Sequence, residues 1–371
     1  MSRINPSYRK TGFEGAKTPS DPIHLAKQII DGNKAALSRA ITLAESRKKE
    51  HQALANQVLE HCVANHGVAN HGVANHGVAN QSEQQTLLTL SRRIGITGYP
   101  GAGKSTLLEA LGLQLVAQGA SVAVLTVDPT GLRTDGSILG DKTRMNELSK
   151  HPSAYIRPSP SSKSLGGVTT STYTSIQLCE AAGFDWVFVE TVGVGQSEAM
   201  VSMMTDIVCL VLIPGAGDDL QGMKRGLMDT VDALIINKSD GPQIDQAKQT
   251  AQHYQQALGW ELLMDSEGEP ETSVIHKVSA ETGEGVEELL SWLHNRWDIG
   301  LSAESVHRKR SATLDRLMTI EASHIVKQWM ESVLEPTSPE WQQAKEHLLK
   351  GDQTLASAVD PIVQKMLKGS E

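Results

Sequence analysis

The residues best suited to chemistry lie in a glycine-rich segment at positions 98–105, which reads GYPGAGKS. It matches the pattern GxxxxGK[ST], in which glycines let successive backbone N–H groups approach phosphate oxygens closely. In this pattern the lysine, here Lys104, reaches the β- and γ-phosphates. The serine, here Ser105, binds magnesium. We expect the phosphates to contact the following residues: Gly98, Tyr99, Pro100, Gly101, Ala102, Gly103, Lys104, Ser105 and Thr106.

The alternative for this segment is a chance glycine-rich turn between a strand and a helix. A β-branched run at 93–97 precedes the segment, and an apolar stretch typical of a helix follows it at 106–116. The N-terminus of such a helix adds partial positive charge beside the phosphates. Agreement over the whole pattern in that context favours a phosphate site over a chance turn.

A second candidate site is the segment NKSD at 237–240, which closes an apolar run. The carboxylate of Asp240 can accept hydrogen bonds from guanine N1–H and from the exocyclic amine, a donor pair that adenine lacks. On its own the segment could be a loop with a polar cap, but its place after a phosphate loop predicts GTP rather than ATP. The expected base-binding residues, here and after the next strand, are Asn237, Lys238, Asp240, Ser279, Ala280 and Glu281.

Acidic residues at the ends of predicted strands supply the expected magnesium site. Glu190 opens the segment ETVG, where GTPases usually carry DxxG, and the N–H of Gly193 would contact the γ-phosphate. Asp128 ends the strand after the phosphate-loop helix, which is the ligand side of an open α/β sheet. We expect Mg²⁺ to be bound by Ser105, Asp128, Asp141 and Glu190. The residues expected to act in hydrolysis are Lys104, Asp128, Glu190 and Gly193.

The elements that must position these residues alternate between strands and helices. Apolar, mostly β-branched runs predict strands at 93–98, 121–128, 186–191, 207–213, 233–240 and 274–280. Such alternation predicts an α/β fold, a P-loop domain with a mostly parallel sheet covered by helices on both faces. The expected domains are an N-terminal helical segment (1–60), a linker (61–91), the P-loop domain (92–298) and a C-terminal helical arm (299–371).

Both flanking regions have helical patterns. In the stretch 22–60, Leu37, Ile41 and Ala44 recur at the spacing of one helical face. The tail from about residue 301 has no strand pattern and predicts two or three helices, interrupted between Pro336 and Pro339.

Composition and charge exclude several classes of partner. Aromatic residues make up 4% of the chain and the formal net charge is -9, so neither nucleic acid nor an anionic membrane is expected to bind. The most apolar run, IVCLVLI at 207–213, is too short to span a bilayer. The three cysteines, Cys62, Cys179 and Cys209, are expected to be reduced thiols. Without an apolar secretory signal at its start, the chain is expected in the cytoplasm.

A five-residue unit, HGVAN or HCVAN, recurs through positions 61–80. Its period matches neither a helix nor a strand, so the repeat cannot keep one apolar face in either element. We interpret it as a linker. Its histidines could bind a metal loosely, although their spacing places no two of them on one helical face; they are His61, His66, His71 and His76.

In the order of its motifs the chain resembles the MeaB/ArgK family of GTPases, which are associated with methylmalonyl-CoA mutase. The most specific segments are GSILGDKTRM (136–145), ETVGVGQSE (190–198) and PGAGDDLQGMKRG (214–226). The resemblance implies a homodimer, joined through the C-terminal arm, that hydrolyses GTP with Mg²⁺ and docks on a cobalamin-dependent mutase. It further implies a role in loading or exchanging adenosylcobalamin and in protecting the mutase from inactivation. Three residues are implied to lie in a switch that responds to the partner: Asp218, Gln221 and Lys224.

The chain departs from the family's pattern in one loop, and other functions stay open. Where the family usually has DPSS and a pair of glycines before SILGD, Gly131 replaces the second serine and Asp135 precedes Gly136. A nickel-inserting GTPase should carry a Cys/His pair near the phosphate loop, which this sequence lacks there. A transport-linked ATPase or kinase conflicts with NKSD, and a non-catalytic scaffold conflicts with the intact pair of Lys104 and Ser105.

Deleting residues 66–80 tests the interpretation of the repeat as a linker. The shortened chain is expected to hydrolyse nucleotide at the rate of the full chain, because no chemistry is assigned to the repeat. Phosphate release measured side by side for the two chains checks this. A large loss of rate in the shortened chain would show that the repeat does more than connect.

Overall fold

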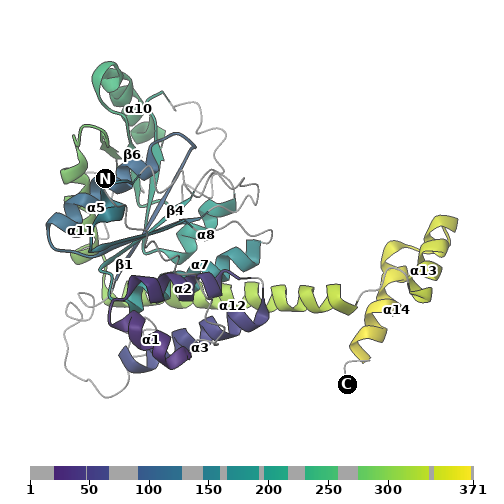
Figure 1. Cartoon of the computed structure of the whole chain (residues 1–371). Coiled ribbons are helices and arrows are strands. Elements are labelled where there is room, and N and C mark those ends of the chain that lie inside the picture. Colours follow the sequence, from purple (N-terminus) through teal and green to yellow (C-terminus); the bar gives the residue numbers. More distant parts are fainter. Residues whose placement is uncertain are drawn as a thin grey trace, which may run out of the picture.

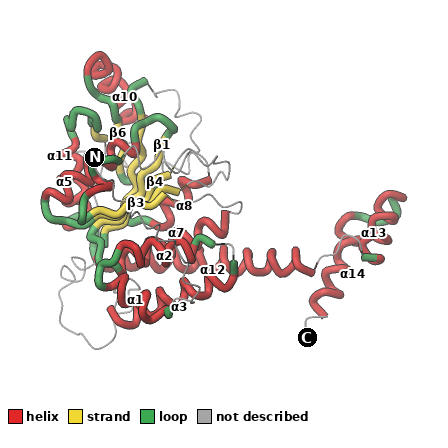
Figure 2. Tube along the Cα trace, viewed as in Figure 1, coloured by secondary structure: helices red, strands yellow, loops and turns green. Residues whose placement is uncertain are grey.

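The computed structural model describes residues 21–46, 48–66, 91–127, 145–158, 165–191, 196–215, 230–257, 275–333 and 338–368. Within these ranges one sheet of seven strands, all paired in parallel, has the order β3-β2-β4-β1-β5-β6-β7. The strands are β1 (Arg92–Gly98), β2 (Val122–Val127), β3 (Ala154–Pro158), β4 (Trp186–Thr191), β5 (Ile207–Leu212), β6 (Ala233–Ile236) and β7 (Ile275–Lys277). Helices lie on both faces of the sheet (Figures 1 and 2), so the predicted α/β fold is confirmed.

Burial of both faces explains why the central strands β2, β4 and β5 are mostly apolar rather than alternating between apolar and polar residues. Every residue of β2, β4 and β5 is buried. On one face the strands pack against α5 (Lys104–Ala117) and α11 (Val286–Asp298). On the other face lie α7 (Leu165–Ala181) and α8 (Gln196–Met204), while α10 (Ile244–Ala257) packs beside β6 and β7. Two short 3₁₀ turns are described as well, at Leu148–Lys150 and Gly241–Gln243.

The edge strand β3 is absent from the sequence prediction. Its sequence, AYIRP, contains an arginine and ends in a proline, so it lacks the continuous apolar run of the other strands. Proline is tolerated at a sheet edge, where one side of the strand needs no donor. β3 is defined by its parallel pairing with β2 over its whole length, and a local pattern could not reveal that pairing.

The N-terminal segment is helical where it is described. It contains α1 (Pro22–Ile30), α2 (Lys34–Ala44) and α3 (Lys49–His66). The predicted apolar face is confirmed, because Leu37, Ile41 and Ala44 are all buried. α3 continues past residue 60, where the linker was expected to begin, through the first unit of the repeat. The later units lie outside the described residues.

The C-terminal region forms three helices in its described part, as the sequence predicts. They are α12 (Ala303–Val333), α13 (Pro339–Lys350) and α14 (Leu355–Lys368). The first half of α12 packs on the domain through side chains buried at helical spacing, namely Val306, Arg310, Thr313 and Leu317. Beyond them α12 projects from the domain, and α13 and α14 pack against each other at its far end (Figure 1). These three helices are called the arm below.

The three cysteines are buried and unbridged, as expected. Burial raises the pKa of the Cys62 thiol to about 11, so this thiol stays protonated near neutral pH and is a poor nucleophile. Among the described helices, none combines the length and the apolar character that crossing a bilayer requires.

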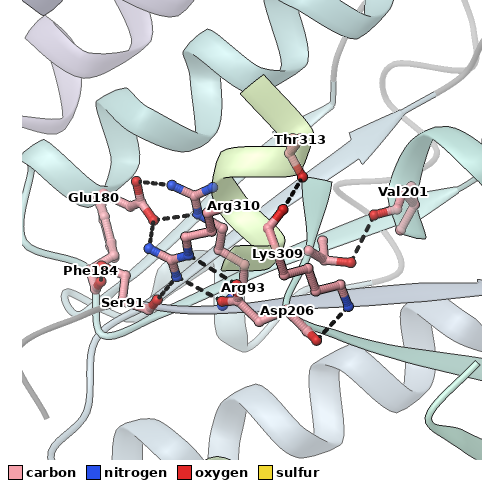
Figure 3. A network of polar contacts seen from close by, with 10 residues as sticks. Ser91, Arg93, Glu180, Phe184, Val201, Asp206, Lys309, Arg310 and Thr313 are labelled. Atoms are coloured by element: carbon pink, nitrogen blue, oxygen red, sulfur yellow. Dashed lines mark hydrogen bonds and ion pairs between the residues drawn. The ribbon is translucent and has the colours of Figure 1, made fainter. Parts of the chain in front are cut away.

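Four buried charged side chains join the sheet to α12 at the N-terminal ends of the strands (Figure 3). Arg93 of β1 forks onto Glu180 of α7, with Nε–Oε1 at 2.6 Å and Nη2–Oε2 at 2.8 Å. Arg310 of α12 forks onto Asp206, which precedes β5, at 2.9 and 2.7 Å. All four side chains are at most 6% exposed, so their opposite charges compensate each other away from water. We call this set the buried charge network.

The pKa of the Asp206 carboxyl is set by burial and by its two arginine neighbours. Burial alone would raise its pKa, but the charge and hydrogen bonds of Arg310, with those of Arg93, hold that pKa below its ordinary value. A carboxyl pKa that is depressed by folding adds stability above the unfolded-state pKa. That stability is lost as the pH falls through the folded-state pKa. The network therefore stabilises the fold at neutral pH and not in strong acid.

Asp206→Ala is expected to lower the free energy of unfolding at pH 7 by about 3–5 kcal/mol, because the charge of Arg310 would stay buried and poorly compensated. Urea denaturation followed by circular dichroism measures the loss. The matched control, Asp245→Ala, removes an exposed ion pair with Lys248 and should cost less than about 1 kcal/mol. Equal losses in the two variants would contradict a stabilising role for the network.

Candidate functional site

The loop between β1 and α5 requires glycine at two points. Gly98 has a φ of 139°, and a Cβ there would collide with the carbonyl oxygen of Val211 in β5. Gly103 has a φ of 83°, and a Cβ there would collide with the side-chain amide of Asn237. Only glycine adopts such backbone angles readily. The loop therefore lies tightly against β5 and against the first residue of the NKSD segment.

Between these glycines the loop turns outward and then back. Tyr99 is half-buried and Pro100 and Gly101 are exposed, whereas Ala102 is buried. The tip of the loop is thus exposed to solvent, and the residue that follows the tip is buried. From this buried residue the chain continues through Gly103 into α5.

Lys104 is the first residue of α5 and is buried beneath the loop. Its ammonium donates to the carbonyl oxygens of Gly98 at 2.8 Å and Tyr99 at 3.0 Å. The N-cap of α5 is Gly103, which has no side chain to bind the first N–H groups of the helix. Those groups and the helix dipole favour an anion at this point. A lysine charge and a helix N-terminus therefore meet where the sequence predicts the phosphates.

Ser105 and Glu190 form the described part of the predicted magnesium site. Oγ of Ser105 donates to Oε1 of Glu190 at 2.8 Å, and both residues are buried. Parallel pairing of β4 with β1 brings Glu190 there, opposite Ile96. A hydroxyl and a carboxylate are the hard oxygen donors that magnesium prefers, so this pair fits the ion. The other predicted members of the metal and γ-phosphate sites lie outside the described residues: Asp128, Asp141 and Gly193.

A cavity of about 300 Å³ opens beside the phosphate loop, where β6 and β7 end. Its size falls within the range of small-molecule sites. Eight of its lining residues are ones that the sequence assigns to nucleotide binding: Gly103, Thr106, Asn237, Lys238, Asp240, Ser279, Ala280 and Glu281. Pro242 and Gln243 line it too and were missed. Their only signal in the sequence is that they follow Asp240 closely.

Asp240 is held in the wall of this cavity by the loop after β7. Oγ of Ser279 donates to Oδ2 of Asp240, and the backbone N–H of Thr282 donates to the same hydroxyl at 3.1 Å. Lys238 has a φ of 59°, a left-handed conformation that is uncommon outside glycine. A carboxylate fixed in this way can accept the N1–H and amine protons of guanine. It presents no donor for the N1 acceptor of adenine when it is ionised.

Asn237 connects the loop to the cavity. Its Nδ2 donates to the carbonyl oxygens of Ala102 at 2.8 Å and Gly103 at 3.3 Å. Its Oδ1 accepts from the backbone N–H of Ala280 at 3.0 Å. One buried amide therefore fixes the phosphate loop relative to both segments that line the cavity. The residues predicted to respond to a partner lie outside the described part of the chain: Asp218, Gln221 and Lys224.

Known proteins share these motifs over most of the chain. The family model described as methylmalonyl Co-A mutase-associated GTPase MeaB matches residues 75–333. GTPase ArgK of Escherichia coli is 47% identical over 215 residues, which are 58% of this chain and 58% of that protein. A Caenorhabditis elegans protein named methylmalonic aciduria type A homolog, mitochondrial, is 40% identical over 319 residues, which are 84% of this chain and 75% of that protein.

A solved structure agrees with the fold as well. The structure titled LAO/AO transport system kinase superposes with a TM-score of 0.64 at 26% identity, covering 94% of this chain and 99% of that chain. The family match extends over well more than half of the sequence. The resemblance seen in the motifs is thus confirmed, and the chain belongs to the MeaB family of methylmalonyl Co-A mutase-associated GTPases, which are P-loop GTP hydrolases.

Proposed function

We propose that this chain hydrolyses GTP with Mg²⁺ and uses the cycle to serve an adenosylcobalamin-dependent methylmalonyl-CoA mutase. The observation that carries the nucleotide part is the junction at Asn237, which ties a phosphate loop to a purine-sized cavity bearing Asp240. The family description supports the mutase as the partner.

The phosphate end of the proposed site stabilises charge. Lys104 would turn from its loop carbonyl oxygens to the β- and γ-phosphates, beside the N–H groups that begin α5. Ser105 and Glu190 would hold Mg²⁺, which neutralises phosphate charge when bound. Positive groups fixed in advance in this way stabilise the charge that develops during phosphoryl transfer. Residues outside the described ranges are proposed to complete the set: Asp128 and Asp141 at the metal, and Gly193 at the γ-phosphate.

The partner functions are the finer part of the proposal. They are the loading or exchange of adenosylcobalamin and the protection of the mutase from inactivation, with Asp218, Gln221 and Lys224 in the responding switch. We also propose a homodimer joined through the arm, in the cytoplasm, with no nucleic-acid or membrane partner. Apolar residues exposed along one face of α12 support a protein partner there, since Met318 is 70% exposed and Ile325, seven positions on, is 58% exposed.

Asp240→Asn is expected to weaken GTP binding about 100-fold, because an amide cannot accept both guanine protons. It should strengthen binding of xanthosine triphosphate, whose 2-oxo group can accept from the new amide. Calorimetric titration with both nucleotides measures the switch. Asp245→Asn, an exposed carboxylate of α10, is the control and should change neither affinity. Unchanged preference for GTP in Asp240→Asn would contradict the assignment of the base site.

Turnover with a purified partner tests the proposed function as a whole. The rate of GTP hydrolysis by the chain should rise when methylmalonyl-CoA mutase is added, since the partner is proposed to act on the switch. Lys104→Ala, which removes the buried ammonium from the phosphate site, should show no turnover with or without the mutase. An equal rate with and without mutase, together with no complex on gel filtration, would reject the mutase as partner while leaving the nucleotide assignment intact.

A further inference from the structure

The short helix α8 connects two distant parts of the domain. It begins at Gln196, soon after Glu190 at the end of β4, on the edge that carries the nucleotide site. It ends at Met204, two residues before Asp206 in the buried charge network. With nine residues at about 1.5 Å each, α8 spans about 13 Å from one edge of the sheet toward the other. α8 is thus one helix that leads from the strand carrying Glu190 to the network.

The far end of α8 is fixed to β1, the strand that leads into the phosphate loop. The backbone N–H of Asp206 donates to the carbonyl oxygen of Arg93 at 2.8 Å. The backbone N–H of Arg93 donates to Oδ2 of Asp206 at 3.1 Å. The guanidinium of Arg93 is held in turn by Glu180 of α7. This end of α8 is therefore bonded to β1 through both the backbone and the carboxylate of Asp206.

Residues of α12 bind the same end of α8 (Figure 3). In addition to the fork of Arg310 on the Asp206 carboxylate, the ammonium of Lys309 donates to the Asp206 carbonyl oxygen at 2.7 Å. The hydroxyl of Thr313 donates to the carbonyl oxygen of Met203, in the last turn of α8, at 2.5 Å. Consecutive turns of α12 thus bind both the last turn of α8 and Asp206, two residues beyond it. A tilt of α8 has to carry this part of α12 with it or break these bonds.

α12 leaves the domain soon after this grip. Among its described side chains none after Leu317 is buried, and a hydrogen bond from Thr170 to Glu321 at 2.7 Å follows one turn later. With 31 residues the helix is about 46 Å long at ~1.5 Å per residue, and Figure 1 shows its far half projecting from the domain. Since only the first half is anchored, a small tilt there becomes a larger displacement at α13 and α14.

We propose that Lys309, Arg310 and Thr313 are positioning residues that couple the tilt of α8 to the direction of the arm. The nucleotide state then sets where the arm points. By linkage, a partner that binds the arm in one direction changes the affinity for GTP. This inference rests on the proposed GTP cycle. It adds a structural connection from the nucleotide site to the C-terminal helices that runs through α8 and α12 rather than through the phosphate loop.

The test measures a distance between the domain and the arm in each nucleotide state. Spin labels go on Gln118→Cys, at the end of α5, and Gln328→Cys, on the projecting half of α12; both positions are exposed and the native cysteines are buried. Labelled chain is diluted into excess unlabelled chain, so that only distances within one chain are read. In the otherwise native chain, the distance is expected to differ between GDP and a non-hydrolysable GTP analogue.

Lys309→Met combined with Thr313→Val removes two of the links without leaving a buried charge alone. We expect the nucleotide-dependent shift in this double variant to fall to about half of the native shift or less, as the coupling is weakened. The matched control is Arg308→Met combined with Thr319→Val, two exposed positions on the same helix, which should keep the native shift. Arg310→Lys keeps the charge but loses the fork, and serves as the second variant with a reduced shift.

Thermal melting and calorimetric binding of the GTP analogue are recorded for every variant. A reduced shift in a variant that melts and binds like the control supports coupling, because a purely structural role would leave the shift unchanged. A native-sized shift in both test variants, or no shift in the native chain, overturns the proposal. Failure of the native chain to bind the analogue contradicts the proposed GTP function instead, so the two failures are told apart.

Discussion

The nucleotide site depends on one buried amide. Asn237 lies after β6, two strands away from the phosphate loop, and it reaches the carbonyl oxygens of Ala102 and Gly103 because glycine leaves no Cβ between them. An amide suits this place because one of its atoms donates and the other accepts, whereas a carboxylate could only accept. Its accepting oxygen binds the N–H of Ala280. The phosphate loop is therefore held at a fixed separation from the cavity that bears Asp240.

At the N-terminal ends of the strands the domain is held together by buried ion pairs. There the buried charge network joins β1, α7, α12 and the residue before β5. β1 spans seven residues, about 23 Å at ~3.3 Å each, so the two fixed regions lie at opposite ends of the same strand. α8 begins six residues after Glu190 and ends two residues before Asp206.

The family match has a structural boundary. It ends at residue 333, where α12 ends, and so includes the grip on α8 but not α13 and α14. The part of the arm that contacts the GTPase domain thus belongs to the matched region. The helices at its far end, with Leu349 and Leu355 exposed at 79% and 70%, lie beyond it. The end of the family match thus divides α12, which contacts the GTPase domain, from α13 and α14.

Local motifs and burial made much of the protein predictable from its sequence. The phosphate loop is contiguous, and its glycine, lysine and serine spacing specifies a strand, a turn and a helix N-terminus without help from distant residues. Six of the seven described strands were predicted, because a strand that is buried on both faces usually contains a run of apolar residues that is visible in the sequence. The role of Asp240 in binding guanine stays a prediction, made from its place at the end of such a run.

Contacts between distant residues were decided by the tertiary structure alone. β3 has no pattern of its own and exists through pairing with β2, and α3 continues into a repeat whose period gave no sign of a helix. Asn237 and Ala102 are 135 positions apart, and Asp206 and Arg310 are 104 apart. A charged or amide side chain looks the same in a sequence whether it is solvated or buried. By itself the sequence predicted which residues bind phosphate and guanine, while the fold decided which polar groups are removed from water together and so must pair.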